Sequence, residues 1–196
     1  MSGSGLVVGE DGIARCAWGD STFDYRSYHD EEWGRPVHGD SALFERITLE
    51  AFQSGLSWLT ILRKRPAFRS AFANFDPAIV VHYGDREVAA LMADEGIVRN
   101  RRKIDATVTN ARALVALQDS EGEGALDRLV WSFAPERHRR PRSIADVVPS
   151  TPESLALSKT LKAHGFVFVG ATTMYAAMQA CGLVDDHIAG CHRATD

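Results

Sequence analysis

The chain has 196 residues, of which 45% are hydrophobic and 24% are charged, a composition that is ordinary for a soluble globular protein. No apolar run approaches the roughly 20 residues needed to cross a bilayer, and the first residues lack the basic region and apolar run of a signal peptide. Three cysteines, an odd number, argue against a disulfide framework. We therefore expect a cytoplasmic protein without a membrane partner.

The charges are unevenly distributed along the chain. The net charge of −4 argues mildly against nucleic-acid binding. However, residues 1–62 carry four basic and ten acidic residues, residues 63–142 carry fifteen and eleven, and residues 143–196 carry three and five. A basic middle segment in an acidic chain can contact phosphates along one face, or it can be ordinary solvated surface, and the charge count allows both.

Helical patterns follow one another along almost the whole chain. We expect residues 1–14 to form a flexible leader and residues 15–196 to form a single compact helical domain. Capping residues and apolar spacing predict helices over residues 21–32, 40–54, 58–62, 66–73, 76–83, 85–93, 100–120, 126–133, 151–165 and 171–181. Only residues 166–169 have a strand-like pattern, and four residues cannot form a sheet. The sequence therefore predicts an all-α protein, with residues 135–149 as an exposed connection.

The helix predicted over residues 40–54 places a carboxylate on its apolar face. Glu50 lies on that face, three residues after Ile47, where a carboxylate is costly unless it is paired or neutralised. Either Glu50 lies at the edge of the stripe and contacts an arginine or a backbone donor, or it is an acid in a ligand pocket. Gly55 ends the helix, and Leu56 and Trp58 follow on a tight turn, which favours a pocket for a flat, cationic or hydrogen-bonding ligand.

Two cysteines and two histidines near the two ends of the chain are candidate metal ligands. Cys16 and His29 lie near the N-terminus, and His187 and Cys191 share one face if the C-terminal segment is helical. Such a set suits a closed tetrahedral zinc site, which would fix chain ends that otherwise fray. The alternative is two buried cysteines and two unrelated histidines, and the spacing alone favours it. Cys181 is expected to be a core thiol.

A basic cluster lies between two of the predicted helices. One helix ends near Gly96, a short turn follows, and a long helix begins near Asn100, an outline typical of a helix–hairpin–helix element. Four of the five residues from Arg99 to Lys103 are basic, and backbone N–H groups at such a turn and helix N-terminus can hold a phosphate. An ordinary helical connection with solvated charges is the alternative.

Aromatic residues form a further cluster. They lie close to acidic residues, which suggests rings at a polar edge rather than an ordinary core, and aromatic faces beside a carboxylate suit a cationic heterocycle. The residues are Trp18, Tyr25, Tyr28, Trp33 and, after Glu50, Trp58.

The motifs occur in an order that extends over nearly the whole chain. They include Arg-Cys-Ala-Trp at residues 15–18, Tyr-His-Asp-Glu-Glu-Trp-Gly at 28–34, Leu-Glu at 49–50, Gln-Ser-Gly-Leu-Ser-Trp at 53–58, Gly-Phe-Val-Phe-Val-Gly at 165–170 and Asp-His at 186–187. Together they resemble the DNA-3-methyladenine glycosylase I family. Its members are all-helical, are related to the helix–hairpin–helix DNA glycosylases, bind a structural zinc and release 3-methyladenine from alkylated DNA.

The resemblance implies roles for individual residues. It implies one structural zinc ion per chain that joins the N- and C-terminal regions, with the ligands Cys16, His29, His187 and Cys191. It implies catalytic roles for Glu50 and Tyr28 in a substrate pocket formed with Trp18, Tyr25, Trp33 and Trp58. DNA contacts are expected at Gly55, Leu56, Gly96, Arg99, Arg101 and Lys103.

The expected reaction is the hydrolysis of the N-glycosidic bond of 3-methyladenine. Alkylation at N3 gives adenine a positive charge and weakens that bond, so the enzyme is expected mainly to flip the nucleotide out of double-stranded DNA and hold the base. Glu50 is expected to be ionised when it meets the damaged base and to accept hydrogen bonds from the exocyclic amine. Water then attacks the sugar carbon. We expect a monomer. Asp119 follows the hairpin at a distance that would suit a general base for the attacking water. We expect it to lie on the surface instead.

Three features depart from the family pattern, and two other functions stay open. Asp185 stands where Asn commonly precedes Asp-His, the leader before Arg15 is extra, and the arginine-rich loop near Arg139, residues 137–142, has no counterpart. A non-enzymatic, zinc-bound DNA-binding module would leave Glu50 and the aromatic cluster unexplained. A helical small-molecule enzyme or ligand-binding protein without nucleic acid would leave the basic hairpin unexplained.

Overall fold

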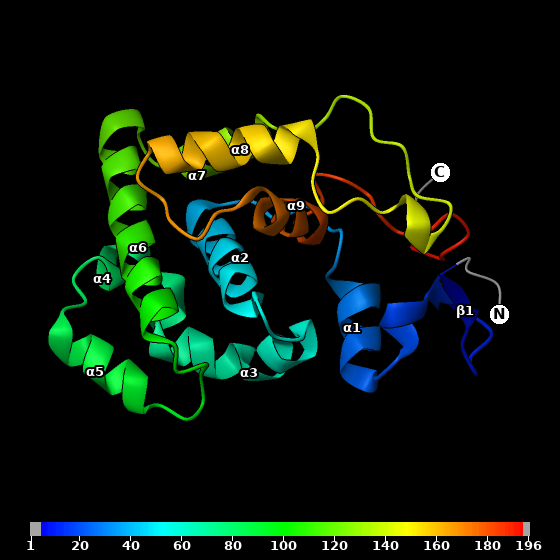
Figure 1. Ribbon diagram of the computed structural model, residues 1–196, viewed down its shortest axis with the longest axis horizontal. Coiled ribbons are helices and arrows are strands. Elements are labelled where there is room, and N and C mark those ends of the chain that lie inside the picture. The colour runs from blue at the N-terminus through cyan, green and yellow to red at the C-terminus, as the bar shows by residue number, and fades with distance from the viewer. Residues whose placement is uncertain (1–4, 194–196) are drawn as a thin grey trace.

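The computed structural model describes residues 5–193 and is mostly helical (Figure 1). Two short strands, β1 (Leu6–Val8) and β2 (Ala14–Cys16), precede the helices. The α-helices are α1 (Phe23–Glu31), α2 (Asp40–Gln53), α3 (Trp58–Ala71), α4 (Pro77–Val80), α5 (Asp85–Ala93), α6 (Arg101–Glu121), α7 (Ala125–Trp131), α8 (Pro152–Ala163) and α9 (Ala171–Ala180). Short 3₁₀ helices are η1 (Ala17–Asp20), η2 (Ala73–Phe75) and η3 (Ile144–Asp146). The prediction of a helical protein is confirmed, with one small hairpin added.

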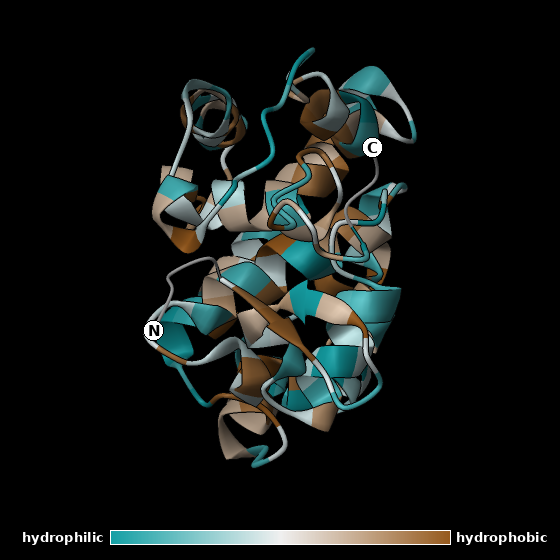
Figure 2. Ribbon diagram, turned by 90° about the vertical axis from the view of Figure 1, so that its right-hand side faces the viewer, coloured by the Kyte–Doolittle hydropathy of each residue, from teal (hydrophilic) through white to brown (hydrophobic). Residues whose placement is uncertain are grey.

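The hairpin corrects the prediction of a flexible leader over residues 1–14. Strand β1 pairs antiparallel with β2, and Leu6 lies opposite Cys16. Leu6 also packs on a small hydrophobic cluster formed by Cys16, Ile188 and Cys191. Figure 2 shows the hairpin on the face that carries both chain ends, with the hydrophobic strand in brown. The C-terminal segment therefore supports this strand, which no local pattern reveals. Residues 1–4 lie outside the described part.

Helix α2 lies at the centre of the fold and packs against α3, α6, α7 and α9. Its side chains Phe44, Leu49 and Phe52 are fully buried, so the helix is apolar on more than one face. Gly39 occupies the N-cap position. Asp40, which starts the helix, instead accepts hydrogen bonds from the backbone N–H groups at the start of α7 and from Gln118.

Helix α3 is continuous where the sequence predicted two segments, 58–62 and 66–73. Pro66 lies inside it, although a proline removes one backbone hydrogen bond and disfavours a helix interior. Ile61 and Phe68, on either side of the proline, are fully buried. Packing of both halves against the core therefore holds the helix together across Pro66.

The strand-like residues 166–169 form no strand. The side chain of Asn110 on α6 accepts a hydrogen bond from the Val167 N–H at 2.8 Å and donates to the Val167 carbonyl at 3.1 Å. The Asn110 side chain thus satisfies the backbone N–H and carbonyl of Val167, which a neighbouring strand would otherwise pair. Phe168 has a positive φ of 58°, which also interrupts an extended conformation.

The two ends of the described chain lie side by side (Figure 1). The His192 N–H donates to the Ala14 carbonyl at 2.8 Å, and the Ile188 N–H donates to Cys16 Sγ at 3.3 Å. Among the described helices, none has the length and hydrophobicity that a transmembrane span requires.

Candidate active site

A cavity of about 210 Å³ opens where η1, α1, α2, α3 and α9 meet. The six residues that we predicted for the pocket all line it. The lining consists of Trp18, Tyr25, Tyr28, Trp33, Glu50, Gln53, Trp58, Ala176 and Gln179. Sequence reasoning assigned no role to Gln53, Ala176 and Gln179. Gln53 belongs to the motif of residues 53–58, and Gln179 belongs to a further motif of the same resemblance, Met-Gln-Ala at residues 178–180. This was the one signal that could have found them.

The aromatic side chains that form the walls of the cavity pack against one another. The ring centroids of Trp18 and Trp33 lie 5.0 Å apart with the rings nearly perpendicular, and those of Tyr28 and Trp58 lie 5.4 Å apart. The Tyr25 hydroxyl accepts a hydrogen bond of 3.0 Å from the Leu59 N–H in the first turn of α3. The first pair is edge-to-face and the second is tilted. These ring contacts and the hydrogen bond hold the walls in place before any ligand binds.

Glu50 is buried in this cavity without a hydrogen bond from any residue that the structure describes. Only 6% of its surface is exposed. Burial raises the pKa of Glu50 to about 8, although the positive charge of Arg46, one helical turn earlier, opposes the shift. Arg46 instead donates to Glu32 at 3.1 Å. Of the two alternatives for Glu50, the described part of the chain therefore favours an acid in a pocket over one that is hydrogen-bonded to an arginine or a backbone donor.

The raised pKa also changes the prediction that Glu50 is ionised. Below about pH 8 the free protein holds this side chain mainly as the neutral acid. A cation in the cavity would favour the carboxylate and release the proton. Tyr28 lies close enough to sense that charge, since burial first and Glu50 second raise the pKa of its phenol. Tyr28 is therefore neutral and can serve as a donor.

Three of the four predicted metal ligands meet at the joined chain ends. The ligand atoms of Cys16, His29 and Cys191 lie within 4.8 Å of one another, and all three residues are buried. The imidazole of His187 lies beside them, with its ring centroid 5.0 Å from that of His29. Cys16 donates to Cys191, which lowers the pKa of Cys191 and raises that of Cys16.

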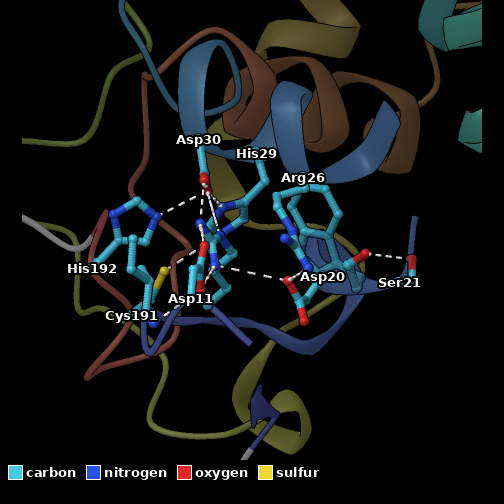
Figure 3. A network of polar contacts seen from close by, with 11 residues as sticks. Asp11, Asp20, Ser21, Arg26, His29, Asp30, Cys191 and His192 are labelled. Carbon is cyan, nitrogen blue, oxygen red and sulfur yellow. Dashed lines mark hydrogen bonds and ion pairs between the residues drawn. The ribbon is translucent and has the colours of Figure 1, made fainter. Parts of the chain in front are cut away.

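Carboxylates orient both imidazoles from outside the cluster. His29 Nδ1 lies 2.8 Å from Asp30 Oδ1, and His187 Nδ1 lies 2.8 Å from Asp185 Oδ1. Figure 3 shows His29 and Asp30 with Cys191 nearby. His187 Nε2 is buried without a hydrogen-bond partner in the described chain, and His29 Nε2 lies 3.4 Å from Cys191 Sγ. Metal-binding histidines typically use one nitrogen for a carboxylate and the other for the metal.

Two glycines leave room for these imidazoles. A Cβ at Gly19 would lie 2.5 Å from Cγ of His29, and a Cβ at Gly34 would lie 2.8 Å from Cε1 of His187. Any larger residue would displace the rings. Asp30 also accepts hydrogen bonds from Arg15 and His192. These bonds lower the pKa of the Asp30 carboxyl even though burial opposes that shift. Arg15 is itself buried and forms an ion pair with Asp11 at 2.8 Å.

The residues predicted to contact DNA separate into two groups. Arg99 and Arg101 are exposed near the start of α6, with surface ion pairs to Glu95 at 3.6 Å and to Asp105 at 2.9 Å. Gly96 lies in the turn between α5 and α6, and its N–H donates to Asp94 at 2.7 Å. An arginine pair and an exposed helix start thus face solvent.

Lys103 does not belong to this exposed group, which corrects its predicted DNA contact. It is 8% exposed, and its ammonium donates to the Phe52 carbonyl at 2.8 Å and the Ser54 carbonyl at 2.6 Å. These carbonyls end α2. Lys103 therefore fastens α6 to the turn of Gly55 and Leu56, where Gly55 has a φ of +83° and Leu56 is exposed.

Three smaller expectations are confirmed. Asp119 is exposed on α6 and does not line the cavity, and Cys181 is 1% exposed in the core. Residues 135–149 are mostly exposed, as expected.

Solved structures with the same architecture define the class of protein first. A crystal structure of 3-methyladenine DNA glycosylase I matches with a TM-score of 0.88 and 44% identity, covering 92% of this chain and 100% of that one. The Staphylococcus aureus 3-methyladenine DNA glycosylase I, studied for its recognition of 3-methyladenine, matches with a TM-score of 0.86 and 32% identity, covering 93% of this chain and 97% of that one. The fold is that of a DNA glycosylase.

Sequence relatives then define the family. DNA-3-methyladenine glycosylase 1 of Escherichia coli is 45% identical over 181 residues, covering 91% of this chain and 96% of the relative. The DNA-3-methyladenine glycosylase of Haemophilus influenzae is 44% identical over 182 residues, covering 90% and 96%. A family model described as methyladenine glycosylase matches residues 18–194. The chain belongs to this family.

Proposed function

We propose that this protein is a DNA base-excision repair enzyme that hydrolyses the N-glycosidic bond of 3-methyladenine in alkylated DNA. One observation carries the proposal. Glu50 is buried and lacks a hydrogen-bond partner in the described chain, and it lies in a base-sized cavity with aromatic walls. The names of the relatives in Escherichia coli and Haemophilus influenzae support the same substrate.

The positive charge of the alkylated base accounts for recognition. Aromatic faces attract a cation more than a neutral adenine, by about 0.5–2 kcal/mol per favourable contact. The cation also lowers the pKa of Glu50, which burial holds at about 8, so the bound state contains a carboxylate opposite a positive charge. A charge-assisted hydrogen bond from the exocyclic amine to Glu50 then adds roughly 1.5–3 kcal/mol. A neutral adenine would leave Glu50 protonated. It would therefore gain neither the cation–π attraction nor the charge-assisted hydrogen bond.

The chemistry of the lesion limits what the protein must add. Alkylation makes the base a good leaving group, so extrusion of the nucleotide, at a cost of a few kcal/mol, and stabilisation of the departing base are the steps to supply. Tyr28 and Glu50 lie together in the cavity and are the proposed catalytic pair, which hold the base while water attacks the sugar carbon. Trp18, Tyr25, Trp33 and Trp58 form the proposed walls.

We place the DNA duplex across two exposed elements. Gly96, Arg99 and Arg101 lie at the α5–α6 turn and offer cations and a helix start to phosphates. The turn of Gly55 and Leu56 lies between Glu50 and Trp58, two residues of the cavity. The exposed Leu56 side chain is therefore suited to enter the gap left by a flipped nucleotide. We propose that one chain suffices, because all of these elements lie on one polypeptide.

The residues at the joined chain ends fit a structural zinc ion. Two cysteines and two histidines supply the donor set of a closed site, and the buried, unpartnered Nε2 of His187 supports its use as a ligand. We propose Cys16, His29, His187 and Cys191 as the four ligands. The zinc would join the N- and C-terminal regions and take no part in base release.

Incubation of the purified protein with methylated DNA, followed by identification of the released bases, tests the proposed function. Release of 3-methyladenine is expected from the wild-type protein, and a Glu50→Ala variant should release it much more slowly. Intact methylated DNA after prolonged incubation with folded wild-type protein would refute the proposal. Tight binding without release would point instead to a DNA-binding module.

A further inference from the structure

The amide of Gln179 is fixed in one orientation at the edge of the cavity. Gln179 lies on α9 and lines the cavity. Its Nε2 donates to Asp186 Oδ2 at 2.6 Å. Asp186 is only 6% exposed and does not line the cavity. One N–H of the amide is therefore engaged outside the cavity. This contact fixes the orientation of the amide, and the carbonyl oxygen is the acceptor that Gln179 can offer to a base.

The surroundings of Asp186 determine which amide atom faces it. The Tyr175 hydroxyl donates to Oδ2 at 2.7 Å, and His138 Nε2 lies 2.7 Å from Oδ1. An ionised carboxylate can only accept hydrogen bonds. The glutamine atom beside it must therefore be the nitrogen, since an amide oxygen there would face another acceptor. Partners from helix α9 and from the segment of His138 hold the carboxylate in place and so prevent a flip of the Gln179 amide.

The other polar groups of the cavity have no such restriction. Gln53 also lines the cavity, but no described residue hydrogen-bonds its side chain, so it can present either its oxygen or its nitrogen. The Tyr28 hydroxyl can donate or accept, and the Tyr25 hydroxyl, which accepts from the Leu59 N–H, can still donate its own proton. Ionised Glu50 and the carbonyl oxygen of Gln179 are thus the two acceptors whose identity is fixed by their surroundings.

A 3-methyladenine attached to DNA carries N–H donors on its 6-amino group alone. That group has two N–H bonds, and the cavity has two fixed acceptors, Glu50 and Gln179. We infer that Gln179, oriented by Asp186, is a specificity-determining residue that accepts a hydrogen bond from the 6-amino group and disfavours purines with a 6-oxo group. This inference rests on the proposed function and concerns the same cavity.

The size of the effect follows from the unfavourable contact. A 6-oxo group would face the Gln179 oxygen, and two acceptors left without a donor in a partly buried site cost about 1–3 kcal/mol. This corresponds to about 5- to 150-fold in affinity. A site built to bind a donor rejects an analogue that lacks it for this reason.

The experiment compares free-base binding, measured through the fluorescence of the cavity tryptophans. The probes are 3-methyladenine and 3-methylhypoxanthine, which carries a carbonyl oxygen in place of the 6-amino group. The wild-type protein should prefer 3-methyladenine. The Gln179→Met variant keeps the length of the side chain but removes the fixed acceptor, and its preference should fall at least fivefold, mainly through weaker binding of 3-methyladenine.

Gln118 provides a matched control. Its Nε2 donates to the buried Asp40 at 2.7 Å, the same kind of contact, but it does not line the cavity. Gln118→Met should therefore lower stability without changing the preference between the two bases. A Gln179→Met variant that keeps the wild-type preference would overturn the inference. An equal change in both variants would also overturn it, because the effect would then be structural.

Asp186→Asn tests the orienting role separately. An asparagine amide can offer a donor to Gln179 and so permits its nitrogen to turn into the cavity, which should reduce the preference for 3-methyladenine. An unchanged preference would refute the orienting role of Asp186. Release of 3-methyladenine from methylated DNA by the wild-type protein is measured in parallel. Its absence would refute the proposed function, whereas release with no change in the Gln179→Met preference would refute this inference alone.

Discussion

At Glu50, folding and recognition place opposite demands on one carboxylate. Burial favours the neutral acid and raises its pKa to about 8, while a cationic base favours the ionised form. Arg46 lies one turn away, and Tyr28 and Cys181 are the other titratable groups that sense the charge of Glu50. Ionisation of Glu50 is thus unfavourable in the free protein, and a positively charged ligand would make it favourable.

We predict that Glu50→Gln lowers the excision of 3-methyladenine about tenfold. The variant keeps the shape and one acceptor, and the loss is the difference between a charge-assisted hydrogen bond of about 1.5–3 kcal/mol and a neutral one of about 1. Wild-type excision should rise with pH towards about 8, whereas the variant should show no such rise. Excision assays from pH 6 to pH 9 measure both. A variant with normal excision would remove Glu50 from the site.

We also predict that Glu50→Gln stabilises the fold above pH 5. The unfolded Glu loses its proton near 4.5 and the folded one near 8, so the unfolded state binds fewer protons between these values. Wild-type stability therefore falls as pH rises from about 4.5 to about 8 and is level above it, and this penalty reaches up to roughly 3 kcal/mol at pH 7. Denaturant melts at pH 5 and pH 8.5 test this. Parallel pH profiles in both proteins would contradict it.

Lys103 shows at the same scale that a basic residue in a motif need not contact a ligand. We predict that Lys103→Met destabilises the protein by roughly 1–3 kcal/mol, because the carbonyls of Phe52 and Ser54 lose their donor. The salt dependence of DNA binding should stay as in the wild type. Melts and binding titrations measure the two effects. A flatter salt dependence would return Lys103 to the phosphate surface.

At the scale of elements, local sequence signals predicted most helices. They did not predict where contacts with other elements override the local pattern. Caps and apolar spacing indicated α2, α5 and α9 almost to their ends. Pro66 suggested a break that core packing removes, and the pattern of residues 166–169 suggested a strand that Asn110 satisfies alone. In each case the deciding partner lies on another element, so no reading of neighbouring residues could supply it.

The α5–α6 turn carries the prediction that belongs to this scale. Arg99→Ala combined with Arg101→Ala should reduce the slope of log affinity against log salt by about one to two units. Stability should hardly change, since exposed ion pairs such as those to Glu95 and Asp105 contribute about 0–1 kcal/mol. Fluorescence anisotropy with undamaged duplex DNA measures the slope.

The exposed loop of residues 135–149 offers the control for this surface. Arg137→Ala combined with Arg139→Ala removes the same charge from a different place. If only the loop variant changed the slope, the phosphates would lie along that loop and the assignment of the α5–α6 turn would be wrong.

At the scale of the whole molecule, the sequence predicted the site better than its surroundings. The aromatic residues and Glu50 were found because their types and order are unusual, and the structure brings them to one cavity. Gln179 and Asp186 were missed, because their roles depend on which amide atom faces which carboxylate. The hairpin of β1 and β2 was missed because its support comes from the other end of the chain.

The joined chain ends carry the prediction about metal. Elemental analysis should find one zinc per chain, and Cys191→Ala should lose it, because Cys191 meets Cys16 and His29 in the cluster. A strong chelator should lower the melting temperature and leave a protein that regains it with added zinc. Cys181→Ala, which alters a core thiol outside the cluster, should keep the metal. Folded protein without zinc would refute the assignment.

The contact between the chain ends also sets an order of assembly. The Ile188 N–H and Cys16 Sγ are 172 positions apart in sequence, and closing so long a loop costs entropy that is repaid only once the ends have docked. Helices α2 to α7 can pack earlier, since their contacts join nearer segments. The cavity takes its walls from Trp18 to Gln179. We therefore expect a nascent chain to form the α5–α6 turn and the turn of Gly55 and Leu56 first, and to complete the cavity at the end of folding.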